Sequence, residues 1–297
     1  MIGSTGSTPS RRLIGRLGLL AAAAGLAFVA TTGVASARAG GDAPVPYGLT
    51  TFAPGQGNVA SAVKQAPGDL LYHGGYIQDH VAVYLVFWGS QWRSDRNGVQ
   101  AYVTNYFKGL GTSADHWSTV TSQYTGKGGH PVFGTSVLKG TWVDAGSAAP
   151  ANASASAIGA EAKRGLAHFR VPASHNVSVI VLSPHGTHPN GFPNAGWCAW
   201  HSSTSGIPFT NMPYVLDAGS SCGANSVRSR LDGFSIVAGH EYLEAVTDPF
   251  PSSGWLDSRG AENADKCAWR NLHTISLPTG SFAVQPTWSN RIHGCAG

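Results

Sequence analysis

The chain has 297 residues, of which only 11% are charged, and its 39 glycines and 17 prolines indicate a globular protein rich in loops. The formal net charge is +4, but three of the 19 basic residues and none of the 15 acidic residues lie in residues 1–37. Beyond residue 37 the charges nearly balance, so we expect no nucleic-acid partner and no attraction to a membrane surface.

Residues 1–37 have the pattern of a secretory signal peptide. A basic start is followed by an apolar run over residues 17–29 and by the small-residue cleavage site Ala35-Ser36-Ala37. The apolar run is too short to predict a membrane-spanning helix. We therefore expect a secreted, extracellular protein. The pair Arg11-Arg12 partly resembles a twin-arginine signal, so both the general and the twin-arginine export routes stay open.

The remaining chain divides into an arm and one domain. Residues 38–68 show no hydrophobic period and many Gly, Pro and Ala, which predicts a flexible N-terminal arm, with a propeptide as the alternative. Residues 69–297 are long enough for one large domain with a substantial core, and we find no internal repeat. We expect this domain to act as a monomer.

Strands and helices are expected to alternate along residues 69–297. The run over 81–88 is continuously apolar, β-branched and aromatic, as in a strand buried on both faces. In chain order we expect strand 81–88, helices 94–110 and 114–124, strand 133–144, helix 153–169, strands 176–184 and 209–217, an amphipathic helix over 231–247 and a closing hairpin over 273–290. This order predicts an α/β fold, a single three-layer domain with a mixed central sheet.

The cysteines predict disulfide bonds. An even number of cysteines in an exported chain is typical of such bonds, and the four here are Cys198, Cys222, Cys267 and Cys295. Three pairings are possible, and we favour the sequence neighbours, Cys198–Cys222 and Cys267–Cys295. A four-cysteine zinc site is disfavoured because the chain contains no Cys-x-x-Cys pair.

A candidate metal site lies in the helix expected over 231–247. The stretch "VAGHEYLEAVTDP" contains His240-Glu241-x-x-Glu244, which differs from the His-Glu-x-x-His signature of zinc peptidases only at its last position. His240 and Glu244 are four residues apart, so they share a helix face and can bind one ion. Glu241 lies beside them, where a carboxylate can activate a metal-bound water as general base. Zinc is the expected metal, with another divalent ion as the alternative.

A third ligand has to come from outside this helix. The following segment "GWLDSRGAENADKCAW" offers Glu262 and Asp265, and also Asp257. We expect Glu262 or Asp265 to complete the metal site, and the other acid to hydrogen-bond a ligand. The alternative is an ordinary helix whose histidine and two acids have no shared function.

Three further histidines are candidates to face the metal. His185 and His188 follow the expected strand 176–184, where α/β sheets place their active-site loops, and His201 follows Cys198. Any of them can stabilise the oxyanion of a tetrahedral intermediate, and we take His201 as the candidate catalytic residue beside Glu241. A structural role is the alternative for each of the three.

The segments "GHEYLEAVTDP", "GWLDSRGAENADKCAW" and "FAVQPTWSN" resemble a family of secreted bacterial proteins regarded as metallopeptidases. That family carries a His-Glu-x-x-Glu motif followed by Glu-x-x-Asp-x-Cys. From about residue 70 onward the chain is also distantly similar to the plant phosphate-induced, EXORDIUM-like extracellular proteins. The resemblance implies a functional set, which consists of His240, Glu241, Glu244, Glu262 and Asp265.

These observations predict a secreted metal-dependent hydrolase, a zinc peptidase acting on a peptide or protein substrate. The first alternative is a non-enzymatic, extracellular or cell-wall-associated EXORDIUM-like protein with a structural metal or an acid cluster. The second is a wall-associated protein that binds carbohydrate through some of its nine tryptophans, although core packing is their more common use.

Overall fold

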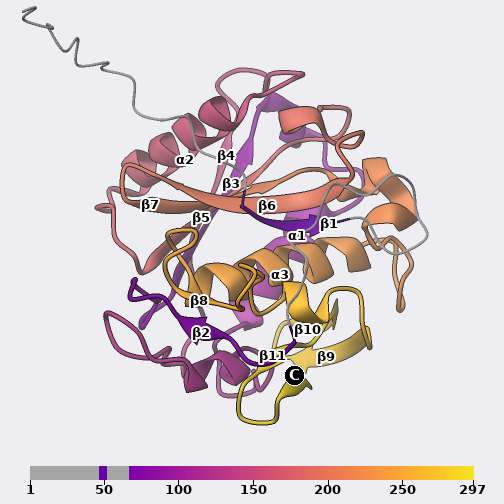
Figure 1. Cartoon of the computed structure of the whole chain (residues 1–297). Helices are drawn as coiled ribbons and strands as arrows, with labels where there is room; N and C mark the ends of the chain where they lie inside the picture. The colour runs from indigo at the N-terminus through magenta and orange to yellow at the C-terminus, as the bar shows by residue number, and fades with distance from the viewer. Residues whose placement is uncertain (1–46, 52–66) are drawn as a thin grey trace, which may run out of the picture. The chain divides into compact units, whose positions relative to one another are not determined.

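The computed structural model describes residues 47–51 and 67–297, so the expected signal peptide and most of the expected arm lie outside the described residues. A six-stranded mixed sheet with the strand order β1-β6-β7-β5-β3-β4 forms its centre (Figure 1). The strands are β1 (Tyr47–Thr51), β3 (Ala82–Trp88), β4 (Leu138–Asp144), β5 (Val177–Leu182), β6 (Trp197–Thr204) and β7 (Ile207–Met212). β4, β3, β5 and β7 run parallel, whereas β6 and β1 are antiparallel to their neighbours.

Position in the sheet explains the residue patterns of the strands. β5 is buried along its whole length and β3 almost so, in agreement with their continuous apolar runs. β4 lies at the edge, and the exposure of its side chains alternates along the strand. β6 and β7 form a hairpin around Ser205 and Gly206, which both have positive φ, as a two-residue type I′ turn requires.

Three α-helices pack against this sheet, namely α1 (Val99–Gly109), α2 (Ala155–Phe169) and α3 (Asp232–Thr247). α2 contacts β3, β5 and β7, and the Ser154 hydroxyl caps it by accepting a hydrogen bond from the Ala157 amide at 3.2 Å. α1 contacts β3 and β4, and α3 contacts β1, β6 and β7. In the view of Figure 1, α2 lies above β6 and β7, and α3 lies below them. The expected α/β class with a mixed sheet is confirmed.

α3 differs from the amphipathic helix expected over 231–247, because all of its residues are buried. The sheet, α1 and the C-terminal hairpin all contact it, so it has no solvent face. Its start is fixed by Asp232, whose carboxylate accepts hydrogen bonds from three backbone amides of the preceding turn at 2.7–2.9 Å. It ends at Thr247, two residues before Pro249, as the sequence predicts.

Short elements complete the domain. The expected closing hairpin is present as β9 (His273–Leu277) and β10 (Gly280–Val284), and β10 packs on α3. The helix expected over 114–124 is a 3₁₀ helix, η2 (Ser118–Gln123), preceded by Asp115, which accepts hydrogen bonds from the Trp117 and Ser118 amides. The remaining short elements are β2 (Leu71–Tyr72), η1 (Ser90–Arg93), η3 (Pro189–Gly191), η4 (Val215–Cys222), β8 (Trp255–Leu256), η5 (Asp265–Cys267), β11 (Thr287–Ser289) and β12 (Gly294–Ala296).

Both expected disulfides are present. Cys198–Cys222 joins β6 to η4, and Cys267–Cys295 joins η5 to β12, with Cα–Cα distances of 5.5 and 5.8 Å. Two disulfides agree with an oxidising, extracellular location. Within residues 47–51 and 67–297, the helices lack the length and apolar character that a bilayer crossing demands.

Residues 47–51 differ from the flexible arm expected over 38–68, because they form strand β1. The stretch YGLTT pairs antiparallel with β6, with Thr50 opposite Ala199 and Thr51 opposite Trp197. Tyr and Thr favour extended structure, and the otherwise open edge of β6 supplies hydrogen-bond partners. The partner strand β6 lies about 150 positions away in the sequence, so no local sequence pattern predicts β1.

A buried acid on α2 makes stability depend on pH. Burial raises the pKa of Glu161 from 4.5 to about 7, although the Arg164 guanidinium, 2.5 Å away, opposes this shift. The folded protein therefore binds this proton more tightly than the unfolded chain does. The stabilising contribution is fully present below about pH 4.5 and is lost as the pH rises through about 7.

We expect Glu161→Gln, which cannot ionise, to remove this pH-dependent contribution. Urea unfolding at about pH 5 and about pH 8 gives the free energy of unfolding of each protein. The difference between variant and wild type is then compared at the two pH values. The variant should gain stability relative to wild type at the higher pH. An equal difference at both pH values would contradict the assignment.

Candidate metal centre

α3 presents the three residues of the His-Glu-x-x-Glu motif on buried faces. His240, Glu241 and Glu244 each have 0% of their surface exposed. His240 and Glu244 lie one helical turn apart, and the His240 Nε2 atom is 2.8 Å from Glu244 Oε1. The sequence-based expectation that these two side chains share one face agrees with this geometry.

The loop after β8 returns to α3 and is tied to it. The Asn263 side-chain amide donates to the Leu243 carbonyl and to the Thr247 hydroxyl, both at 2.8 Å. The Asn263 carbonyl accepts a hydrogen bond from the Trp288 amide, and the Cys267–Cys295 disulfide follows four residues later. These contacts fix the backbone between Glu262 and Asp265 and again just after Asp265.

Glu262 and Asp265 both reach the motif. The Asp265 amide donates to Glu244 Oε1 at 3.1 Å, and Asp265 Oδ1 is 3.5 Å from His240 Nε2. Glu262 is fully buried, and one of its ligand atoms lies within 4.8 Å of one of Glu244. Asp257, the third acid of the segment, instead shapes the loop by accepting hydrogen bonds from the Arg259 and Ala261 amides.

His201 enters the cluster from β6 and lies among its carboxylates. Its Nδ1 atom is 3.3 Å from Glu241 Oε2 and 3.5 Å from Glu244 Oε2. Its Nε2 atom is 3.5 Å from Glu262 Oε1. His201 therefore lies where it could hold a metal ion together with Glu244 and Glu262, and its catalytic role stays a prediction.

Two groups of three residues bring one ligand atom each within 4.8 Å of the others. One group consists of His201, Glu244 and Glu262, and the other of His240, Glu241 and Glu244. Glu244 is common to both. The donor set of imidazole nitrogens and carboxylate oxygens is one that zinc and related divalent ions accept.

Burial and mutual attraction set the charges of the cluster. Burial disfavours the charged form of both histidines, but the surrounding carboxylates outweigh it and raise the pKa of His201 and His240 well above the usual value. Burial also acts on Glu244, yet His240 and His201 overcome it and lower the pKa of Glu244 to about 2. Glu244 is the anionic centre of the cluster.

The other two glutamates hold protons more tightly. Burial raises the pKa of Glu241 to about 7, opposed by its contact with His201. Burial also raises the pKa of Glu262 well above its usual value, although His201 opposes the shift. A buried carboxylate that lacks a compensating charge takes up a proton, and a divalent cation can replace that proton.

Unsatisfied atoms in the cluster fit a metal ion. Among the described residues, both oxygens of Glu262, Oε2 of Glu244 and Nδ1 of His240 have no hydrogen-bond donor or acceptor. Leaving one such atom buried without a partner costs about 1–3 kcal/mol. Coordination of a cation by the carboxylate oxygens would satisfy them, so the residues present fit a divalent metal.

Thr50 of β1 covers the proposed general base. Its backbone amide and its hydroxyl both donate to Glu241 Oε1, at 3.2 and 2.5 Å. His201 takes the other oxygen of Glu241, so both oxygens have partners within the protein. Nothing in the local sequence around Thr50 indicates this contact, because the two residues are 191 positions apart.

Two of the three candidate histidines lie outside this cluster. The side chain of His185 is 77% exposed and pairs with Asp217, and His188 is exposed beside η3. Neither of these two candidates faces the cluster, and the exposed positions agree with the alternative of a role away from it. Loops after parallel strands do gather at one edge of the sheet, but the histidine–glutamate cluster is formed by side chains from β6, α3 and the loop after β8 instead.

The tryptophans in β3 and β6 belong to the core rather than to a surface groove. Trp88, Trp197 and Trp200 are buried, and the rings of the last two are 6.5 Å apart in an edge-to-face arrangement. Trp269 is partly buried and donates through Nε1 to the Thr51 carbonyl at 2.8 Å. These positions favour packing over carbohydrate binding by tryptophan.

No family model, curated protein or solved structure matches this chain. The resemblance to secreted bacterial metallopeptidases and to EXORDIUM-like proteins thus stays a prediction made from the motifs. The functional assignment has to rest on the chemistry of the cluster.

We expect the purified, chelator-treated protein to bind one zinc ion per chain. Glu262→Gln should weaken this binding more than about tenfold, because it removes a charged oxygen ligand. Glu161→Gln, which changes a buried glutamate on α2, is the matched control and should leave zinc binding unchanged. Titration calorimetry with metal analysis by mass spectrometry measures both. Equal zinc affinity in the two variants would remove Glu262 from the site.

Proposed function

We propose that the protein is a secreted metal-dependent hydrolase, a peptidase that uses zinc. The observation that carries the proposal is the buried cluster of two histidines and three glutamates, in which carboxylate oxygens of Glu244 and Glu262 lack hydrogen-bond partners among the described residues. The motif order and its resemblance to secreted bacterial metallopeptidases add support. The two disulfides support export.

In this proposal each residue has a defined part. Glu244, His240 and His201 would hold the zinc ion together with Glu262, and Asp265 would orient Glu244 through its amide. When bound, zinc supplies Lewis acidity toward a carbonyl oxygen and makes water more acidic. The Glu241 carboxylate would accept the proton of the attacking water and deliver it to the leaving amine. His201 would keep the Glu241 carboxylate in position.

The place of β1 suggests how a peptide reaches Glu241. β1 is an edge strand that pairs with β6, and Thr50 occupies one oxygen of Glu241. An extended peptide that replaced β1 on the edge of β6 would lay its backbone beside His201 and Glu241. A peptide or protein therefore suits this site better than a compact small molecule.

We also propose that the α/β domain has three layers. The contacts of α2 with β3, β5 and β7 support one covering layer, and the contacts of α3 with β1, β6 and β7 support another. In this arrangement the metal cluster lies on the α3 side of the sheet.

One observation favours the non-enzymatic alternative. The cluster is closed, since His240, Glu241, Glu244 and Glu262 each have 0% exposure and His201 has 1%. A structural metal in a secreted scaffold would satisfy the same carboxylates without any need for substrate access. The peptidase needs Glu241 as a general base, whereas the structural alternative gives Glu241 no catalytic role.

Replacement of Glu241 separates these functions. In the peptidase, Glu241→Gln should retain zinc but lower the rate of peptide hydrolysis by about 10²–10⁴-fold, because the general base is lost. His240→Ala should instead lose the metal, since too few ligands remain to hold it tightly. A peptide-library digest followed by mass spectrometry, with metal-replete wild type and a chelated sample, measures cleavage.

Glu161→Gln is again the control and should cleave as wild type does. Cleavage that persists in Glu241→Gln would reject this mechanism. A metal-replete wild type that cleaves no peptide would favour the structural alternative.

The contact between Thr50 and Glu241 makes a second prediction. Thr50→Val removes the hydroxyl donor to a buried carboxylate and should lower the free energy of unfolding by about 1.5–3 kcal/mol, measured by urea unfolding with chelator present. Because β1 is then held less firmly, peptide cleavage should rise. Thr51→Val is the control, since the Thr51 hydroxyl makes no hydrogen bond with the described residues. Lower stability without faster cleavage would show that β1 does not restrict the site.

A further inference from the structure

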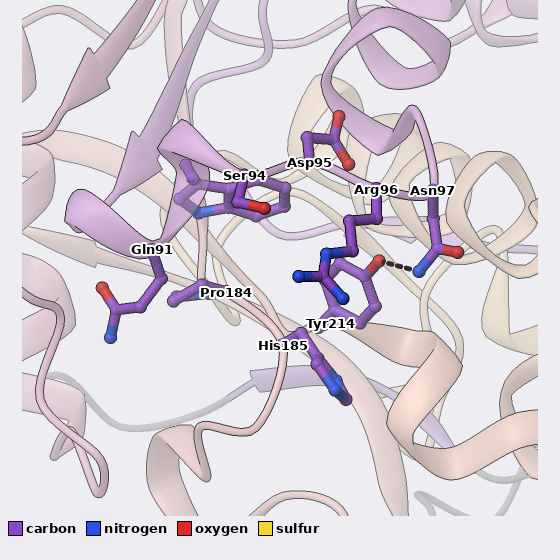
Figure 2. A pocket seen from close by; sticks show the side chains of 9 residues that line it. Gln91, Ser94, Asp95, Arg96, Asn97, Pro184, His185 and Tyr214 are labelled. Carbon is purple, nitrogen blue, oxygen red and sulfur yellow. Dashed lines mark hydrogen bonds between the residues drawn. The ribbon is translucent and has the colours of Figure 1, made fainter.

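A crevice separate from the metal centre lies where three parallel strands end. It is lined by the segment that follows β3, by Pro184 and His185 after β5, and by Tyr214 after β7 (Figure 2). Its volume is about 400 Å³, which is the size of a site for a small molecule. None of its lining residues belongs to the metal cluster.

The topology makes this edge of the sheet a natural ligand site. β3 is followed in the chain by β4 on one side, and β5 is followed by β6 and β7 on the other side. The loops after β3 and β5 therefore diverge and leave an opening between them. In open α/β sheets, ligands bind at such a switch point, outside the carboxyl ends of the strands.

Arg96 is the cationic group of the crevice. Its guanidinium forms no ion pair or hydrogen bond with the residues that the structure describes, and Figure 2 shows it pointing toward Tyr214 and His185. The two carboxylate oxygens of the neighbouring Asp95 already accept hydrogen bonds from the Val99 and Gln100 amides at the start of α1. No residue that the structure describes therefore occupies the donors of Arg96, and we take them to be available for a ligand.

Other polar groups of the wall are fixed within the protein. Both ends of the Gln91 side-chain amide bind the backbone of Ala149, at 2.9 and 3.2 Å. The Asn97 side chain donates to the Tyr214 hydroxyl at 2.6 Å. These contacts hold the rim of the crevice in place before a ligand arrives.

His185 supplies an oriented hydrogen-bond acceptor. Its Nδ1 atom is 2.5 Å from Asp217 Oδ1, while Asp217 Oδ2 accepts the Gly186 amide at 2.8 Å. Because a carboxylate only accepts, Nδ1 is the protonated nitrogen, and in the neutral ring Nε2 carries the lone pair. A ligand hydroxyl can donate to that nitrogen.

From these groups we propose that the crevice binds a small hydroxylated carboxylic acid, such as a sugar acid. The carboxylate would pair with the two-pronged guanidinium of Arg96, and a hydroxyl would donate to Nε2 of His185. The rings of Trp92 and Tyr214 provide apolar walls for the carbon skeleton. This site does not depend on the proposed peptidase function.

The charge of the crevice favours a single carboxylate over a phosphate. One guanidinium, Arg96, faces a site whose lining includes Asp95, and a second carboxylate, Asp217, pairs with the lining residue His185. A monoanion balances Arg96, whereas a dianionic phosphate would add repulsion with both aspartates.

The test is titration calorimetry of the purified protein with glucuronate. We expect saturable binding with a Kd below about 1 mM. Glucose, which has the same ring hydroxyls without the carboxylate, and inorganic phosphate should each bind at least about tenfold more weakly. Arg96→Gln should weaken glucuronate binding by about tenfold or more, and His185→Phe should also weaken it.

Arg93→Gln is the matched control, since Arg93 lies on η1 nearby and its guanidinium binds the Ala145 carbonyl outside the crevice. It should change the affinity by less than about twofold. Arg96→Lys keeps the positive charge but lacks the planar guanidinium that can donate two hydrogen bonds to one carboxylate. Its affinity for glucuronate should therefore lie between those of wild type and Arg96→Gln. Far-ultraviolet circular dichroism checks that each variant is folded.

Four results would overturn the proposal. They are no saturable binding of glucuronate by wild type, equal binding of glucose, phosphate binding as tight as glucuronate binding, and unchanged affinity in Arg96→Gln. If Arg96→Gln does not fold, Arg96→Lys and His185→Phe decide in its place.

Discussion

The burial of several carboxylates next to two histidines is the constraint on which the centre of this protein depends. Glu241, Glu244 and Glu262 are removed from water completely. Ionised groups cost several kcal/mol each when they leave water without compensation, so each needs a proton, a cation or hydrogen bonds at short range. The surrounding elements supply part of this compensation, and a divalent metal would supply the rest.

Backbone ties keep these groups at their places. The loop that carries Glu262 is held to α3 by Asn263 and is anchored further on by the Cys267–Cys295 disulfide. On the opposite side His201 is part of β6, whose position is fixed by pairing with both β7 and β1. If these residues hold a metal as proposed, such rigid elements would keep the ligands in place.

The two proposed sites of the domain have opposite electrostatic conditions. In the cluster around Glu244, charges are buried, strongly coupled and fully enclosed by the sheet and α3. In the crevice around Arg96, the cation is exposed and the nearby Asp95 and Asp217 are already engaged by protein donors. The first arrangement suits a tightly held ion, and the second suits a ligand that exchanges with solvent.

Several features of this protein could be predicted from the spacing of residues in the sequence. The helix with His240 and Glu244 on one face follows from a four-residue separation, and the disulfide partners and the closing hairpin were predicted correctly. Only the tertiary structure decided that Thr50 and His201 meet Glu241, because β1 and β6 acquire their places through strand pairing between distant segments. The alternation of α and β patterns indicates a sheet, but strand order depends on long-range contacts that no short stretch of sequence encodes.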